Sequence, residues 1–170
     1  MDPLWIYLFF TALPLYVANA SAVISRGKTP LDFNRTLSDG QPLFGNGKTW
    51  KGTILGIASG TLAGALSMYF FPMFTAQVST SYIWYSFFLS MGAILGDLAG
   101  SFLKRRMKIK RGEPAHLLDQ LDFVIGGMAL AVIVSKPDWT GVILLIMITP
   151  FMHMASNRLA YMLGLKKVPW

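Results

Sequence analysis

Five long runs of apolar residues constrain the fold of this chain more than any other feature of its sequence. Each run is close to or above the roughly 20 residues that a helix needs to cross a bilayer. The runs span residues 4–24, 52–71, 82–103, 117–135 and 141–165. We therefore expect an all-α polytopic membrane protein, in which a bundle of five transmembrane helices forms a single transmembrane domain over residues 1–170.

Basic residues are distributed unevenly between the two sides of this predicted bundle. Of the 15 lysine and arginine residues, all except Lys136 fall after the first run, after the third run or near the C-terminal end. Because basic residues accumulate on the cytoplasmic side of membranes, we expect the N-terminus outside, the C-terminus in the cytoplasm and two long cytoplasmic loops. The chain has no cysteine, which excludes disulfide and thiolate chemistry.

Glycine recurs at every fourth position in the second run and in the third. This spacing keeps the glycines on one face of each helix, where missing side chains let two backbones approach closely. We therefore predict packing seams along both helices, and the third helix also carries Asp97. The glycines in question are Gly52, Gly56, Gly60 and Gly64, followed by Gly92, Gly96 and Gly100.

Asp97 is an acidic residue inside an otherwise apolar helix, shortly before the basic residues Lys104 and Arg105. A carboxylate at such a depth costs about 2.5 to 3.5 kcal/mol on insertion scales, so it normally has a partner or a function. Two interpretations remain open. Asp97 forms a structural ion pair with Lys104 or Arg105, or it is a ligand to a cation.

The fourth run opens with a second acidic group, because Asp119 and Asp122 share one face of the predicted helix. One interpretation is that these acids complement the positive N-terminal end of that helix. The other joins them to Asp97, since consecutive antiparallel helices bring both groups to the same membrane boundary. Carboxylates beside basic residues suit Mg²⁺, which completes its shell with water and phosphate oxygens. We therefore predict a Mg²⁺ site at Asp97, Asp119 and Asp122.

The segment FGNGKTWKG, residues 44–52, is rich in glycine and lysine and leads into the second helix. It is not a P-loop, because Pro42 stands where that motif requires glycine and no strand precedes it. Glycine N–H groups, lysine charges and a helix N-terminus are nonetheless features of phosphate sites. The alternative is a basic turn that anchors the second helix at the lipid headgroups. The candidate nucleotide- and phosphate-binding residues are Gly45, Asn46, Gly47, Lys48, Thr49 and Lys51.

Several segments of the sequence resemble known lipid cytidylyltransferases. GDLAGSFLKRRMKIKRG followed by LLDQLDF is similar to the signature of membrane CTP:phosphatidate cytidylyltransferases. FGNGKTWKG, GDLAGSFLKRR, LLDQLDF and NRLAYMLGLKKVPW resemble more closely the small archaeal CDP-archaeol synthase family, over nearly the whole chain. The bacterial pattern contains lysine–aspartate and histidine–glycine–glycine elements that are missing here, which leaves Glu113 and His116, like His153, without an assigned role.

This resemblance implies transfer of CMP from CTP to 2,3-di-geranylgeranyl-glycerol 1-phosphate, an isoprenoid ether lipid phosphate, with release of pyrophosphate. It also implies that the aspartates named above bind Mg²⁺ and that Ser101, Lys104 and Arg105 contact phosphates. The expected partners are CTP, the lipid phosphate and the bilayer, with no nucleic acid. The expected location is the cell membrane, with the active site facing the cytoplasm.

The implied reaction requires no dedicated base, because a phosphate monoester has a second pKa of about 6 and is already ionised. Catalysis would rest on positioning and on cations that neutralise the phosphates and the pyrophosphate leaving group. Two other functions remain open. A CTP-dependent polyprenol or lipid kinase would release CDP, and a non-enzymatic lipid-binding or ion-translocating membrane protein would turn over no nucleotide.

Overall fold

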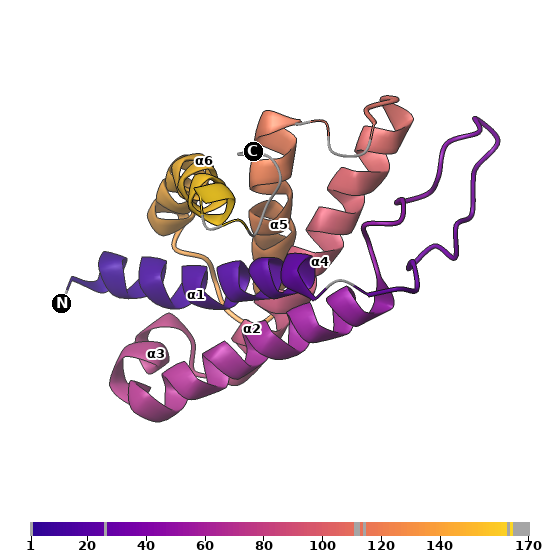
Figure 1. Ribbon diagram of the computed structural model, residues 1–170. Helices are drawn as coiled ribbons and strands as arrows, with labels where there is room; N and C mark the ends of the chain where they lie inside the picture. The colour runs from indigo at the N-terminus through magenta and orange to yellow at the C-terminus, as the bar shows by residue number, and fades with distance from the viewer. Residues whose placement is uncertain (1, 26, 111–112, 114, 163, 165–170) are drawn as a thin grey trace.

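The structure of the protein is a computed structural model that describes residues 2–25, 27–110, 113, 115–162 and 164 (Figure 1). Within these residues the regular secondary structure is entirely helical, so the predicted all-α class is confirmed. The predicted end of the last helix at residue 165 lies outside the described residues, as do Arg26, Arg111, Lys166 and Lys167. The helices are α1 (Pro3–Ile24), α2 (Trp50–Phe70), α3 (Pro72–Val78), α4 (Tyr82–Arg106), α5 (His116–Ala131) and α6 (Trp139–Met162).

The observed helices follow the apolar runs, with two differences. The segment between the second and third predicted runs, residues 72–81, contains the helix α3, which begins at Pro72. Proline suits the first position of a helix, because the N–H group there has no partner within the helix. The fourth helix ends at Ala131 instead of residue 135. The residues that follow form turns, and the Ser135 hydroxyl donates to the Val78 carbonyl oxygen at the end of α3 (3.1 Å).

Four helices are long and apolar enough to cross a membrane, namely α1, α2, α4 and the part of α6 up to Leu159. The helix α5 has 16 residues. At 1.5 Å per residue it extends about 24 Å, which is less than the roughly 30 Å hydrocarbon core of a bilayer. The described residues therefore support a multi-pass membrane protein with four candidate spans, and the predicted count of five is not confirmed.

The glycine seams bring three helices into close backbone contact. A Cβ atom added at Gly60 of α2 would lie 2.7 Å from the Pro14 carbonyl oxygen of α1 and 2.3 Å from the Ser90 hydroxyl of α4. A Cβ atom added at Gly92 of α4 would lie 2.3 Å from the Gly126 carbonyl oxygen of α5. Both predicted packing seams are therefore confirmed. In Figure 1, α1 and α2 lie side by side and α4 crosses them to meet α5.

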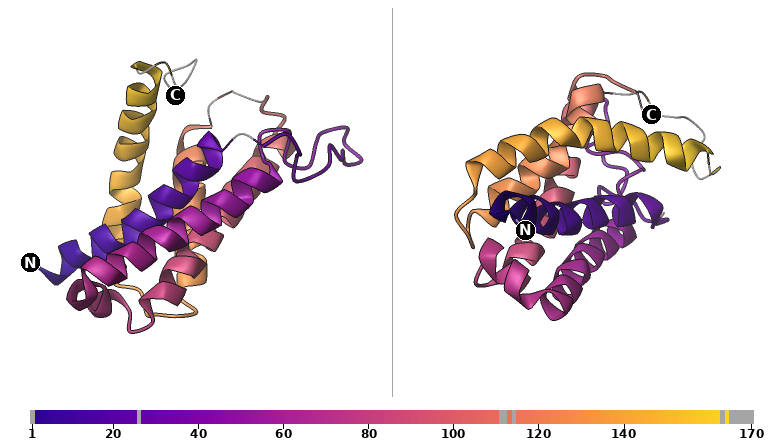
Figure 2. Two further views of the ribbon diagram at one scale, coloured as in Figure 1. Left: turned by 60° about the horizontal axis from the view of Figure 1, so that its bottom comes forward. Right: turned by 90° about the vertical axis from the view of Figure 1, so that its left-hand side faces the viewer.

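The apolar core lies between α1, α4 and α5, where Leu15, Leu89 and Phe123 are completely buried. The helix α6 is attached to α1 by a hydrogen bond between the hydroxyl groups of Tyr16 and Thr149 (2.8 Å). Beyond this contact α6 diverges from α1 toward its C-terminal end (Figure 2, left). The glycine seams and the core therefore join α1, α2, α4 and α5 closely, whereas α6 is held less closely along its C-terminal part.

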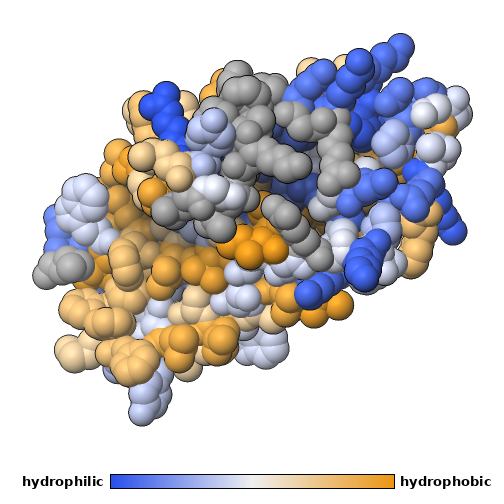
Figure 3. Space-filling model, viewed as in Figure 1, coloured by the Kyte–Doolittle hydropathy of each residue, from blue (hydrophilic) through white to orange (hydrophobic). Residues whose placement is uncertain are grey.

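Polar residues gather at one end of the bundle, which we call the basic end. Here α1 ends, α2 begins, and the last turn of α4 carries Lys104, Arg105 and Arg106. Cations at the C-terminal end of a helix are favoured by its partial negative charge. Figure 3 shows hydrophilic residues over this end and hydrophobic residues over most of the remaining visible surface. That division is expected of a protein whose helices lie in a bilayer and whose basic end meets water.

Candidate active site

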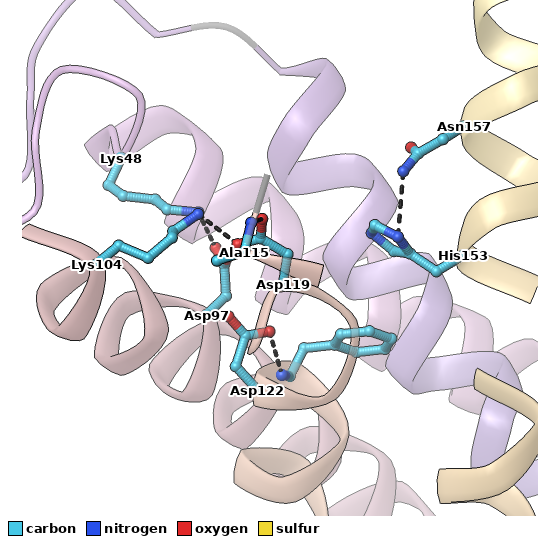
Figure 4. A network of polar contacts seen from close by, with 9 residues as sticks. Lys48, Asp97, Lys104, Ala115, Asp119, Asp122, His153 and Asn157 are labelled. Carbon is cyan, nitrogen blue, oxygen red and sulfur yellow. Dashed lines mark hydrogen bonds and ion pairs between the residues drawn. The ribbon is translucent and has the colours of Figure 1, made fainter. Parts of the chain in front are cut away.

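The three acidic side chains predicted to act together meet at the basic end. Asp97 comes from α4, Asp119 and Asp122 come from the first turns of α5, and they face one another in Figure 4. The close helix pair makes this arrangement possible, because a Cβ atom at Gly100 would lie 2.1 Å from the Asp122 Oδ2 atom. The glycine seam thus leaves the space that the Asp122 carboxylate occupies.

Two lysine side chains reach into this acidic group. The Lys48 Nζ atom lies 2.5 Å from the Asp97 Oδ2 atom, and the Lys104 ammonium group forms an ion pair with Asp119 (Figure 4). Asp97 is therefore in an ion pair, but its partner is Lys48 of the loop instead of the expected Lys104 or Arg105. No sequence pattern indicates this pairing directly, because residues 48 and 97 are distant in the chain.

Two further carboxylate oxygens of this group accept hydrogen bonds from backbone N–H groups at the start of α5. Asp119 Oδ2 accepts a hydrogen bond from the Ala115 N–H group (3.0 Å), and Asp122 Oδ1 accepts one from Phe123 (2.7 Å). The interpretation that these acids complement the start of the helix therefore holds for Asp119. Among the described residues, no group of three or more His, Cys, Asp or Glu side chains is arranged to hold a metal ion.

A cavity of about 320 Å³ opens beside the two lysines. One wall is a loop segment and the other is the end of α4, so the cavity joins the glycine- and lysine-rich segment to the helix that carries Asp97. Three cationic side chains, Lys48, Lys104 and Arg105, line it together with Ser101. The lining residues from the loop are Pro42, Phe44, Gly45, Asn46, Gly47 and Lys48.

Two of the predicted phosphate-binding residues lie outside this cavity. The Thr49 hydroxyl caps the N-terminus of α2, where it accepts a hydrogen bond from the Gly52 N–H group (3.2 Å). Lys51 is exposed in the first turn of α2. The Gly45 N–H group donates to the Asp32 carboxylate (2.9 Å), so Gly45 contributes to the cavity by its backbone position and not by a free N–H group.

Comparison with known proteins shows the family. The chain matches the family model "CarS-like: CDP-archaeol synthase" over residues 1–170. The chain belongs to the CDP-archaeol synthase family. It is 44% identical to the CDP-archaeol synthase of Thermococcus onnurineus over 97% of this chain and 96% of the relative, and 46% identical to that of Methanocaldococcus jannaschii over 93% of each.

A solved structure of an intramembrane enzyme for archaeal membrane lipid biosynthesis is also similar, with a TM-score of 0.78 and 36% sequence identity over 88% of this chain and 91% of that one. The resemblance found in the sequence is therefore confirmed. As a member of the CDP-archaeol synthase family, the chain is a nucleotidyltransferase of lipid biosynthesis, and family membership decides against the non-enzymatic alternative.

Arg106 and Asp32 hold the loop in place, and the sequence alone did not indicate that either residue belongs to the site. The Arg106 guanidinium group donates to the Asp39 carboxylate (2.5 Å) and to the Pro42 carbonyl oxygen (2.6 Å), which fastens the loop to the end of α4. Asp32 binds backbone N–H groups within the loop. The only sequence signal for Asp32 is its place in a turn-forming segment, since aspartate often accepts backbone hydrogen bonds in turns.

Proposed function

We propose that this chain transfers CMP from CTP to an unsaturated geranylgeranyl ether glycerol phosphate at the junction of the cavity and the acidic group. The observation that carries the proposal is the position of Lys48 and Lys104, which line the cavity and also bind the carboxylates of Asp97 and Asp119. A site for polyphosphate and a site for a cation therefore share these two side chains. Adjacent sites of this kind suit nucleotidyl transfer.

The cavity is suited to the triphosphate of CTP by its charge. Lys48, Lys104 and Arg105 provide three positive groups, and Ser101 adds a hydroxyl donor. The reaction forms a bond between an oxygen of the lipid phosphate and the α-phosphorus of CTP, and it breaks the bond to pyrophosphate. The cationic side chains would neutralise the charge that develops on the leaving pyrophosphate, and charge stabilisation of this kind usually contributes more to catalysis than any other single effect.

We further propose that Asp97, Asp119 and Asp122 hold Mg²⁺ when the nucleotide is bound. The donor set fits, because all three residues offer the carboxylate oxygens that Mg²⁺ prefers, and the Asp122 carboxylate lies against Gly100 of α4, the helix that carries Asp97. Bound Mg²⁺ supplies charge neutralisation and orientation of phosphate oxygens. No carboxylate is needed as a base, since the lipid phosphate is ionised at neutral pH with a second pKa of about 6.

Metal binding by these carboxylates requires a rearrangement of the two lysines. The Lys48 and Lys104 ammonium groups hold Asp97 and Asp119, which are the groups that a metal ion needs. Both lysine side chains also line the cavity. We infer that with Mg²⁺ held by these carboxylates the two lysines would contact the nucleotide phosphates instead, so that metal and nucleotide would bind cooperatively.

The basic end is proposed to face the cytoplasm, in line with the distribution of basic residues. The chain has no cysteine, so single cysteines can report the orientation. Ser38→Cys in the loop should be protected from a membrane-impermeant maleimide in intact cells, whereas Thr80→Cys between α3 and α4 should react. Both positions are exposed. Labelling of Ser38→Cys alone would overturn the proposed orientation.

The reaction is tested with purified protein, Mg²⁺, CTP labelled on the α-phosphate and the geranylgeranyl ether glycerol phosphate. Label in the lipid fraction, with pyrophosphate released in equal amount, is expected. Label in free CDP would identify a kinase, and no turnover would contradict an enzymatic role. Omission of Mg²⁺ with added chelator should abolish the transfer, and unchanged transfer would remove the metal from the proposal.

A further inference from the structure

The loop of residues 27–49 forms one wall of the cavity, although it has no regular strand. Its two ends are joined by backbone hydrogen bonds, from Leu31 N–H to the Lys48 carbonyl oxygen (2.8 Å) and from Trp50 N–H to the Thr29 carbonyl oxygen (3.2 Å). These bonds hold the base of the loop. They do not hold residues 44–47, which line the cavity, so another group must fix that part.

The Asp32 carboxylate holds the part of the loop that lines the cavity. Asp32 Oδ2 accepts hydrogen bonds from the N–H groups of Phe44 and Gly45, both at 2.9 Å, and Oδ1 accepts one from Asn34 at 3.0 Å. The residue is only 4% exposed, and it forms no ion pair with a lysine or arginine in the described part of the chain. A buried carboxylate without a cation needs such N–H donors to offset its desolvation.

The backbone around Asp32 has three residues with positive φ angles, and two of them carry side chains that disfavour this conformation. Phe33 and Asn34 have φ angles of 49° and 60°, in the left-handed region, and Gly45 has a φ of 90°. The left-handed conformation costs roughly 1–2 kcal/mol for a residue with a side chain. This cost falls on Phe33 and Asn34, since glycine adopts a positive φ without it, and the hydrogen bond from Asn34 to Asp32 compensates for part of it.

A short chain of contacts connects Asp32 to the reacting groups. The Gly45 N–H group binds Asp32, the Gly45 carbonyl oxygen accepts a hydrogen bond from the Lys48 N–H group (3.1 Å), and the Lys48 side chain reaches Asp97. Asp32 itself does not line the cavity. We propose that Asp32 is a positioning residue of the nucleotide site, which sets the loop so that Lys48 faces the triphosphate.

This inference rests on the proposed function, and its main test is the kinetics of Asp32→Asn. The amide can no longer accept hydrogen bonds from both Phe44 and Gly45 through one negative oxygen. Because nucleotide contacts depend on the loop, the KM for CTP should rise about tenfold or more, while kcat changes by less than about threefold. An unchanged KM, or a loss confined to kcat, would overturn the positioning role.

Two matched controls accompany this variant. Asp138→Asn makes the same change at an exposed carboxylate, which accepts hydrogen bonds from the Thr140 and Gly141 N–H groups at the start of α6, away from the cavity. Asn34→Gly keeps the N–H donor to Asp32 and suits the positive φ angle. Both controls should retain the KM for CTP of the unmodified protein. A KM increase in Asp138→Asn equal to that in Asp32→Asn would make the effect non-specific and contradict the proposal.

Hydrogen exchange gives a readout that does not depend on activity. The amides of Phe44 and Gly45 should exchange at least about tenfold faster in Asp32→Asn than in the unmodified protein. If that variant does not fold, Gly45→Ala serves instead, because an added Cβ meets no atom within 4 Å and only the φ of 90° is strained. It should raise the KM for CTP in the same way, and an unchanged KM would contradict the proposal. If the unmodified protein transfers no label, the proposed function fails, whereas hydrogen exchange still decides whether Asp32 holds the loop.

Discussion

The carboxylate side of the candidate site lies on two helices, whereas the opposite wall lies on an irregular loop. On the helical side, α4 and α5 approach through Gly92, Gly96 and Gly100. The absence of side chains at these glycines lets the two helices lie close enough for their aspartates to meet. On the loop side, Asp32 and Arg106 bind backbone atoms, so the wall is placed by side chains that are present. The helical side should therefore be sensitive to added atoms, and the loop side to lost hydrogen-bond partners.

Removal of one charge on the helical side should have the largest effect, because it leaves the geometry in place and removes the proposed metal ligand. Asp97→Asn should lower CMP transfer by about 100- to 1,000-fold, the range found when one preorganised stabilising group is lost. The measurement is transfer of α-phosphate label, with a melting curve to show that the variant is folded. Activity close to that of the unmodified protein would exclude Asp97 as a metal ligand.

Addition of one methyl group on the same side should have the next largest effect. A Cβ atom at Gly96 would lie 2.1 Å from the Asp122 carbonyl oxygen, and a backbone atom cannot move aside without separating the helices. Gly96→Ala should therefore destabilise the protein by about 1–3 kcal/mol, the usual cost of overpacking, and reduce transfer strongly. Thermal unfolding measures the first effect.

The control for Gly96→Ala is a larger addition on the exposed face of the same helix. Ala99→Leu places more atoms on α4 than Gly96→Ala does, but Ala99 is exposed. Its melting temperature and activity should stay close to those of the unmodified protein. Equal losses of stability and activity in the two variants would show that α4 tolerates added volume at neither position. The close packing at the glycine seam would then not explain the effect of Gly96→Ala.

The same difference between helices and loop explains which parts of the fold and of the site could be predicted from the sequence. The helices and the glycine seams follow from apolar runs and from spacing by four, because both features are local and repeat along the chain. The acidic group was also predictable, since consecutive antiparallel helices had to bring Asp97 near Asp122. The early end of α5 was not predictable, because residues 132–134 are apolar like the helix before them, yet they form turns held by backbone hydrogen bonds such as that from Val134 N–H to the Ala131 carbonyl oxygen.

The loop was less predictable for a different reason. Its structure depends on single hydrogen bonds between residues that are distant in sequence, such as those from Phe44 and Gly45 to Asp32. No periodic pattern encodes such bonds. The pairing of Lys48 with Asp97 was missed for the same reason, although each residue is conspicuous in its own segment.

A smaller effect, on metal affinity, is expected for a substitution at Lys48, where the loop side of the site contacts the helical side. Lys48→Met keeps an unbranched side chain of similar length but removes the ammonium group from Asp97. Without nucleotide, the variant should bind Mn²⁺, used as a spectroscopic substitute for Mg²⁺, about tenfold more tightly, because no lysine competes for the carboxylate. Added CTP should then strengthen Mn²⁺ binding less than it does in the unmodified protein. The readout is paramagnetic resonance of free Mn²⁺, and weaker binding in the variant would contradict the proposed exchange.

The smallest effect concerns the response of the loop to acid. Burial alone would raise the pKa of Asp32, but hydrogen bonds from Phe44, Gly45 and Asn34 outweigh burial and hold the pKa below its usual value of 3.8. A carboxylate with a lowered pKa stabilises the folded state above the unfolded pKa, and this contribution is lost as the pH falls through the folded pKa. Asp32 should therefore stabilise the loop fully at neutral pH and progressively less below about pH 4.

The test compares melting temperatures of the unmodified protein and Asp32→Asn between pH 3 and pH 7. At neutral pH the variant should be less stable by about 1–2 kcal/mol, since it loses charge-assisted hydrogen bonds. This difference should shrink as the pH falls below about 4, because protonation then weakens the same bonds in the unmodified protein. Asp138→Asn serves as the matched substitution at the start of α6. A difference between Asp32→Asn and the unmodified protein that stays constant down to pH 3 would show that the Asp32 charge does not hold the loop, and that its shape alone does.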